Sequence, residues 1–159
     1  MLYALLVAAL VDQIVKYLVR THIPLGTSVP FLPGLVELTH WQNTGAAFSI
    51  LSEHTWLLTL VSAVVAVALT VVLFKKVFRH PFGVASLSIV LAGAIGNLID
   101  RALFGSVTDM FNLLFMRFAV FNVADICVVC GGIAFCVYFL FLYDREKKEE
   151  PHDSHPAEG

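Results

Sequence analysis

The sequence predicts an all-α membrane protein, a bundle of four transmembrane helices with a small β element on its outer membrane surface. Of its 159 residues, 58% are hydrophobic and 14% are charged, whereas soluble domains are about 45–50% apolar and about 25% charged. Four apolar runs each approach the roughly 20 residues that a helix needs to cross a bilayer. The length suits one integral membrane domain, residues 1–145. The net charge of -2 gives no large basic surface, so we expect no nucleic-acid partner.

The first apolar run, about residues 1–19, is expected to be a retained helix and not a cleaved signal peptide. No Lys or Arg precedes its apolar core, and Asp12 and Lys16 follow where a cleavage region would lie. These two residues are four apart, so on a helix they share a face in the order that favours an ion pair. The pair either lies near the helix end, with its charges reaching water, or faces the interior of the bundle.

Residues 21–53 are expected to form an outer segment that does not cross lipid. Prolines and glycines interrupt it, and an irregular backbone cannot pair its polar groups inside a bilayer. Within it, Leu35–Trp41 is rich in strand formers and predicts a short strand or hairpin lying on the membrane. The next stretch, Asn43–Phe48, contains Gly45 and two alanines. It forms either an ordinary turn or a place where the backbone approaches a ligand closely.

The second and third spans, about residues 55–74 and 82–103, are joined by a short basic linker. The linker carries Lys75, Lys76, Arg79 and His80. Such a cluster marks the cytoplasmic side of a membrane protein. Near the end of the third span, spacings of three and four place polar side chains on one helix face. They belong to Asn97, Asp100 and Arg101. We interpret them as a functional or supporting cluster, the alternative being a helix end that has reached water.

An outer loop, residues 104–120, leads to the fourth span, about residues 122–142. The loop predicts a turn and a short extended piece up to Asp109, followed by an apolar stretch that lies along the membrane. Asn122 and Asp125 are three apart at the start of the span, so on a helix they share a face. A charged side chain costs about 2.5–3.5 kcal/mol at the centre of a bilayer, and Asp125 therefore indicates a function.

The expected topology places both termini in the cytoplasm. Four spans return the chain to its starting side, and basic residues follow the fourth span just as they follow the second. The acidic tail, residues 146–159, is expected to be disordered, and its two His are expected to be solvated and not metal ligands. The polar residues of the spans and loops then collect on the outer side. They are Asn43, Asn97, Asp100, Arg101, Asp109 and Asp125.

Two carboxylates that share a site cannot both ionise easily, so the pKa of one falls and the pKa of the other rises. The ionised member can take a proton from a water that attacks a peptide carbonyl. The protonated member can donate to the carbonyl oxygen, as in aspartic peptidases. If Asp109 and Asp125 meet at the outer membrane face, this chemistry becomes available there.

Three cysteines, Cys127, Cys130 and Cys136, lie in the last apolar run. The Cys127-x-x-Cys130 spacing is compatible with a redox or metal pair. No His or further Cys lies nearby to complete a site, so we interpret all three as small apolar packing residues. No metal and no cofactor are expected.

Five motifs follow one another along the four predicted spans. They are Asp12-Gln13-x-x-Lys16, Asn43-Thr44-Gly45-Ala46-Ala47-Phe48, Gly96-Asn97-Leu98-Ile99-Asp100-Arg101, Gly105-x-Val107-x-Asp109 and Phe121-Asn122-x-Ala124-Asp125. Each is weak alone, but their order is highly specific. Over about residues 6–143 the chain resembles the bacterial lipoprotein signal peptidase family, also called signal peptidase II.

The resemblance implies an intramembrane aspartyl endopeptidase of the bacterial cytoplasmic (inner) membrane, with its active site toward the outer face. Its substrate would be a prolipoprotein carrying diacylglycerol, cleaved just before the lipid-modified cysteine, and its other partner the membrane lipid. Asp109 and Asp125 match the catalytic pair of the family. Asp12 and Lys16 match a structural polar pair. The positions that line or brace the site would be Asn43, Gly45, Asn97, Asp100, Arg101 and Asn122. We expect a monomer that needs no metal.

Two other interpretations stay open at this point. Buried polar residues on several helices also mark ion paths, which would suit a small transporter or a proton-relay subunit. A conduction path needs polar groups at several depths, whereas these are expected mostly toward one surface. A purely structural scaffold would explain Asp12 and Lys16, but not Asp109 beside Asp125.

Overall fold

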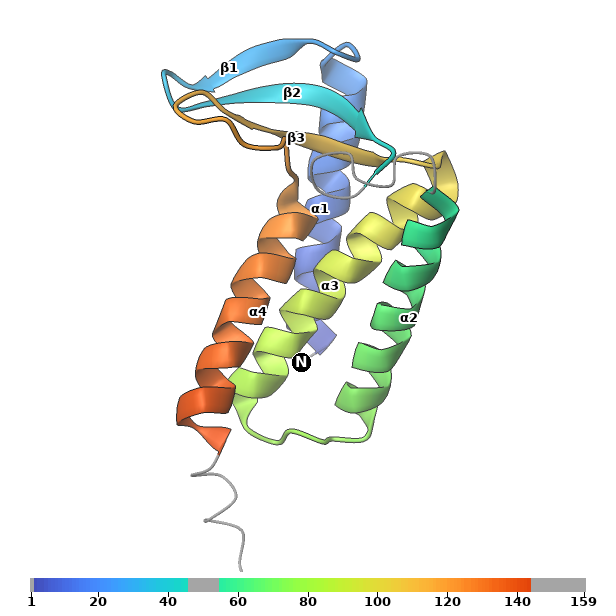
Figure 1. The fold of residues 1–159 in the computed structure, drawn as a ribbon, viewed down its shortest axis with the longest axis vertical. Helices are drawn as coiled ribbons and strands as arrows, with labels where there is room; N and C mark the ends of the chain where they lie inside the picture. Colours follow the sequence, from blue (N-terminus) through green and yellow to red (C-terminus); the bar gives the residue numbers. More distant parts are fainter. Residues whose placement is uncertain (1, 46–54, 144–159) are drawn as a thin grey trace, which may run out of the picture.

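A computed structural model of the chain describes residues 2–45 and 55–143, which form four helices and one three-stranded sheet. Along the chain these are α1 (Leu2–His22), β1 (Ser28–Leu32), β2 (Val36–Asn43), α2 (Thr55–Phe74), α3 (Pro81–Phe104), β3 (Val107–Leu113) and α4 (Val123–Phe141). The sheet lies across one end of the helices, and the linker between α2 and α3 lies at the other end (Figure 1). The expected disordered tail, residues 146–159, lies outside the described residues.

Three of the helices, α2, α3 and α4, are long and apolar enough to cross a membrane by length and composition. The helix α1 is not among them, because it carries Asp12, Lys16 and Arg20. The predicted four helices and small β element are therefore present. A membrane crossing by α1 remains a prediction.

The ends of α3 follow from local sequence signals. His80 caps the N-terminus by accepting a hydrogen bond from the backbone N–H of Phe82, and Pro81 occupies the first turn. At the other end Gly105 adopts φ 69°, a left-handed conformation that a glycine reaches without strain. This turn directs the chain out of α3 and into β3, which begins at Val107.

The sheet is antiparallel with the order β1-β2-β3. The strand expected over Leu35–Trp41 is β2, and it pairs with β1, which lies before that stretch within the outer segment 21–53. The third strand comes from the loop expected over residues 104–120. That loop was predicted to contain only a short extended piece, but it pairs with β2 as far as Leu113. The strand β2 pairs with the backbone polar groups of β3 and so extends it beyond Asp109. Because β2 lies far from β3 in the sequence, a local pattern could not indicate this pairing. In this register Trp41 is opposite Asp109, and Asn43 is opposite Val107.

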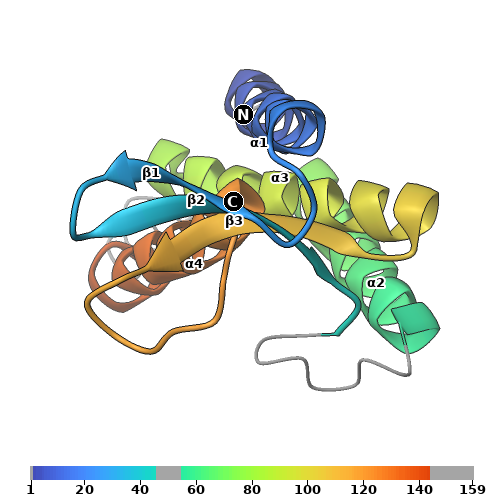
Figure 2. The same cartoon turned by 90° about the horizontal axis from the view of Figure 1, so that it is seen from above.

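The helix α3 packs against the three other helices, and Figure 2 shows α1 and α2 on opposite sides of it. Its contact with α4 depends on glycines. A Cβ at Gly93 would collide with the carbonyl oxygen of Ala124, and a Cβ at Gly131 would lie 3.0 Å from the carbonyl oxygen of Ser86. The two helix backbones therefore approach closely, as in other small-residue interfaces between membrane helices.

Candidate active site

Asp109 lies in β3 and is almost completely buried, with 2% of the residue exposed. Asn122 Nδ2 donates a hydrogen bond to Asp109 Oδ1 at 2.6 Å, and Asn43 Nδ2 donates to Asp109 Oδ2 at 3.0 Å. Each carboxylate oxygen therefore accepts one amide hydrogen. These two bonds hold the carboxylate in a single orientation.

Burial raises the pKa of Asp109 from its ordinary value of 3.8 to about 6. The hydrogen bond from Asn43 lowers the pKa and the negative charge of Asp125 raises it, while Asn122 acts in the same direction as Asn43. Near neutral pH this carboxyl group therefore holds a proton more readily than an exposed aspartate does. A general acid needs this property.

Asp125 is held at the N-terminus of α4 by a capping box with Asn122. The backbone N–H of Asp125 donates to Asn122 Oδ1 at 2.9 Å, and the backbone N–H of Asn122 donates to Asp125 Oδ2 at 3.2 Å. The capping box fixes the Asp125 carboxyl group at the first turn of α4. Asn122 therefore contacts both Asp125 and Asp109, and it is itself fully buried.

Asn97, on α3, is the second amide that joins the site. Its Nδ2 donates to Asp125 Oδ1 at 2.8 Å. Its Oδ1 accepts from Lys16 Nζ at 2.9 Å and from Asn122 Nδ2 at 3.1 Å. Since both of these neighbours are donors, the amide nitrogen of Asn97 has to face the carboxylate of Asp125.

The predicted pair of Asp12 and Lys16 faces the interior of the bundle and not the helix end. Lys16 Nζ lies 2.9 Å from Asp12 Oδ2, and the two side chains are 0% and 1% exposed. Lys16 Nζ also lies 3.5 Å from Asp100 Oδ2. Asp12 Oδ1 accepts a hydrogen bond from the backbone N–H of Ala124 at 2.8 Å. The pair therefore ties α1 to the first turn of α4, the turn that carries Asp125.

Asp100 anchors β3 to α3. Its Oδ2 accepts from the backbone N–H of Thr108 at 2.9 Å, and its Oδ1 lies 3.5 Å from Arg20 Nη1. Arg20 also donates to Thr108 Oγ1 at 3.0 Å, so it braces the strand residue that precedes Asp109. Sequence reasoning did not include Arg20 in the site. The available signal was its position four residues after Lys16, on the same face of α1.

Arg101 and Gly45 lie on the other side of the carboxylates. Arg101 donates to Ser62 Oγ on α2 at 3.4 Å and to the carbonyl oxygen of Gly45 at 3.5 Å. Its buried Nε has no hydrogen-bond partner among the described residues. The backbone N–H of Gly45 donates to Asn43 Oδ1 at 2.9 Å, which turns the amide nitrogen of Asn43 toward Asp109. Asn43–Gly45 is therefore a turn that also orients a side chain of the site.

A cleft of about 580 Å³ opens beside the carboxylates and is lined by residues of α2, α3 and α4. We call it the membrane-side cleft. Its polar end is formed by Asn43, Asn97, Arg101, Asp109, Asn122 and Asp125, and its apolar walls include Val61, Val65, Ala94, Ile126, Val128 and Val129. An apolar chain that enters between these helices would therefore meet the two carboxylates.

The three cysteines carry free thiols, and Cys130 lines the membrane-side cleft. Within residues 2–45 and 55–143, no group of three or more His, Cys, Asp or Glu side chains is arranged to hold a metal ion.

The fold and the site are those of a membrane protein with two carboxyl groups, Asp109 and Asp125, at the head of a cleft between its helices. A sequence profile described as "Signal peptidase (SPase) II" matches residues 4–141. The chain therefore belongs to the signal peptidase II family.

Relatives with high coverage are similar to the chain throughout. The lipoprotein signal peptidase of Enterococcus faecalis is 41% identical over 93% of this chain and 92% of its own length. The lipoprotein signal peptidase of Brevibacillus brevis is 38% identical over 88% of this chain and 96% of its own length. Among solved structures, a bacterial membrane enzyme determined by the in meso method at 2.3 Å has a TM-score of 0.81 and 29% identity, covering 96% of this chain and 93% of its own.

Proposed function

We propose that this protein is a lipoprotein signal peptidase that removes the signal peptide from a diacylglyceryl-modified prolipoprotein, cleaving just before the lipid-modified cysteine. Asp109 and Asp125 are its catalytic pair. The observation that carries this proposal is the position of Asn122, which contacts both carboxylates at the head of the membrane-side cleft. Two acids held by one residue are placed to act on the same peptide bond.

In the proposed reaction Asp125 is ionised and Asp109 is protonated. Asp125 takes a proton from a water molecule, the oxygen of that water attacks the carbonyl carbon, and Asp109 gives its proton to the carbonyl oxygen. When the tetrahedral intermediate collapses, the C–N bond breaks and the leaving amine takes the proton from Asp125. The proton on the former carbonyl oxygen returns to Asp109. Water is the only co-reactant that this reaction needs.

The surrounding residues have supporting roles in this proposal. Asn43, Asn97 and Asn122 orient the carboxylates, with Gly45 turning Asn43 into place. Arg101 lines the membrane-side cleft, so its guanidinium is available to a carbonyl of the substrate. The buried residues Asp12, Lys16 and Asp100 hold α1, α3, β3 and α4 together behind the pair.

We further propose that α1 crosses the membrane with the other helices. Its charged residues Asp12 and Lys16 are buried, while the residues that it exposes between Tyr3 and Leu18 are apolar or aromatic, among them Leu6, Leu10 and Ile14. An apolar exterior with internally paired charges suits lipid. The domain then spans residues 1–145 as a monomer of the cytoplasmic membrane, with both termini in the cytoplasm. The sheet and the carboxylates lie toward the outer face, opposite the basic linker.

The test is cleavage of a purified lipid-modified precursor in detergent or lipid vesicles. Asp109→Asn and Asp125→Asn should each lower turnover by about 10²–10⁴ or more, because each removes one proton-transfer group. Both variants should still insert into membranes. Glu37→Gln makes the same chemical change on β2, away from the pair, and should keep most of the activity. Wild-type turnover should also survive EDTA.

Near-normal turnover of either aspartate variant would refute the proposed pair while leaving the family assignment intact. Loss of activity on adding EDTA, restored by zinc, would instead show that the acid–base pair is not sufficient. Thermal unfolding of each variant in detergent separates loss of chemistry from loss of fold.

A further inference from the structure

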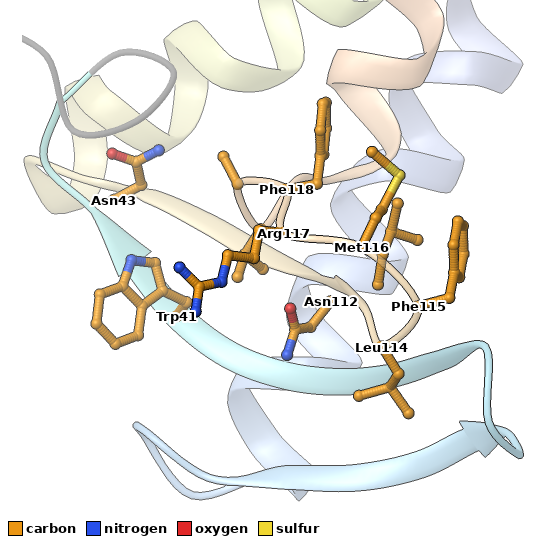
Figure 3. Close-up of a pocket in the computed structure, with 11 residues that line it drawn as sticks. Trp41, Asn43, Asn112, Leu114, Phe115, Met116, Arg117 and Phe118 are labelled. Carbon is orange, nitrogen blue, oxygen red and sulfur yellow. The ribbon is translucent and has the colours of Figure 1, made fainter.

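A second cleft, of about 910 Å³, lies between β2 and the loop that joins β3 to α4 (Figure 3). We call it the outer cleft, and its lining comprises Trp41, Asn43, Asn112 and residues 113–120. It shares four lining residues with the membrane-side cleft: Asn43, Phe118, Ala119 and Val120. Because Asn43 donates a hydrogen bond to Asp109, the boundary between the clefts lies beside the carboxylates. The two clefts therefore adjoin one another beside Asp109.

Both clefts combine apolar and polar groups, in different arrangements. In the membrane-side cleft the polar groups lie at the carboxylates and the walls beyond are apolar. In the outer cleft an indole, two amides and a guanidinium lie among apolar residues of the loop 113–120. A substrate that crosses the carboxylates must place its apolar signal segment in the membrane-side cleft. The first residue after the cleaved bond is the lipid-modified cysteine, whose acyl chains stay in lipid. The chain that follows this cysteine leaves the membrane and then enters the outer cleft.

Arg117 is the one charged residue among the described residues that line the outer cleft. Figure 3 shows its guanidinium pointing over the sheet toward Trp41, while Phe118 points away from the sheet. Arg117 is exposed and has no ion-pair partner within residues 2–45 and 55–143. Glu37, on the same strand as Trp41, already accepts a hydrogen bond from Asn112 at 2.7 Å. The guanidinium is thus available to a carboxylate from outside the chain.

We propose that the outer cleft binds the part of the substrate that follows the cleaved bond, and that Arg117 selects an acidic side chain there. The proposal rests on the proposed function, because it takes the scissile bond to lie beside Asp109 and Asp125. A guanidinium can hold a carboxylate with two parallel hydrogen bonds, which a Lys or Asn side chain of the substrate cannot accept. Arg117 is then a specificity-determining residue and takes no part in the chemistry.

The experiment compares lipid-modified peptide substrates that differ at one position only, which carries Asp, Asn or Lys. An extended chain advances about 3.3 Å per residue, so the variable position is moved stepwise through the first few residues that follow the lipid-modified cysteine. At the position that reaches Arg117, kcat/KM for the Asp substrate should exceed that for the Lys substrate by about two- to fivefold, the range of an exposed ion pair. The difference should lie in KM and should shrink as salt is added.

Substitutions of Arg117 give the decisive comparison. The measured quantity is the ratio of kcat/KM for the Asp substrate to kcat/KM for the Lys substrate, which does not depend on how much active enzyme each preparation contains. Arg117→Glu should invert the ratio, and Arg117→Gln should bring it to about one. Lys75→Glu makes the same change of charge on the linker at the opposite end of the molecule. It should keep the wild-type ratio.

A wild-type ratio of one at every position, or a ratio that Arg117→Glu leaves unchanged, would overturn the proposal. An equal change in Lys75→Glu would also overturn it, because net charge alone would then explain the preference. If Arg117 pairs instead with lipid phosphates, the rate for all three substrates depends equally on anionic lipid and the proposal fails. If the Asn substrate is not cleaved at all, the proposed function itself has failed. If Arg117→Glu does not fold, the proposal is tested by the Asp-to-Lys ratio of Arg117→Gln and by the salt dependence of the wild-type ratio.

Discussion

At the residue scale, the geometry of the site depends most on Asn122. Its side-chain nitrogen donates to Asp109 Oδ1 and to Asn97 Oδ1, and its backbone N–H donates to Asp125 Oδ2. A neutral residue can hold two carboxylates close together without adding a charge of its own. The raised pKa of Asp109 then comes mainly from its burial in the strand β3.

The raised pKa of Asp109 predicts the pH dependence of the reaction. Its proton is lost as the pH rises through about 6, so kcat/KM should fall above that pH, by up to tenfold for each further unit. The measurement is the initial rate at low substrate concentration between pH 5 and 8, at about constant ionic strength. A rate that rises steadily across this range would show that Asp109 acts in its ionised form.

At the scale of elements, the close contact of α3 with α4 sets the position of Asp125 relative to Asn97. Both residues lie at the same end of the two helices, where Gly93 on α3 touches the backbone of Ala124. Any added volume at this contact would push the first turn of α4 away from α3. The hydrogen bond of 2.8 Å between Asn97 and Asp125 crosses the same interface, so the helix contact and the site are coupled.

Gly93→Ala should therefore lower both stability and activity. Overpacking of a close contact costs about 1–3 kcal/mol, and the displaced Asp125 should lower kcat more than it raises KM. Gly132→Ala is the matched control, because a Cβ at Gly132 meets nothing within 4 Å. Thermal unfolding in detergent and steady-state kinetics measure the two effects. Equal behaviour of the two variants would mean that α4 does not depend on this contact.

At the scale of the whole molecule, the polar residues lie inside and the apolar residues lie outside. The most buried charged residues include Asp12, Lys16 and Asp100. Many large apolar residues of α2 and α4 are exposed, for example Val67, which is 63% exposed, and Leu140, which is 72% exposed. This distribution is the reverse of that in a soluble domain and suits a protein surrounded by lipid.

The proposed orientation can be tested by labelling single cysteines with a membrane-impermeant maleimide, after Cys127, Cys130 and Cys136 have been replaced. Leu32→Cys, on the sheet, should react in intact cells. Lys75→Cys, on the linker, should react only after the membrane is made permeable, because a basic linker stays on the cytoplasmic side. The opposite pattern would place the carboxylates in the cytoplasm.

Local composition was enough to predict the helices and several residues of the site. Apolar runs predicted the helices, since burying or embedding about 20 apolar residues requires no knowledge of their neighbours. The cost of a carboxylate in such a run pointed to Asp125, and ordered motifs pointed to Asp109. The spacing of Asp12 and Lys16 predicted their ion pair, which the structure contains at 2.9 Å.

How the residues of the site meet follows from contacts between elements that are distant in the sequence. Asn43 and Asp109 are 66 residues apart, and they come together because β2 and β3 pair in one register. The third strand, the bracing by Arg20 and the outer cleft beside Arg117 depend on contacts of this kind. A sequence pattern repeats along one element and carries no information about which distant element lies opposite, because that choice is made by packing and hydrogen bonding of the whole chain.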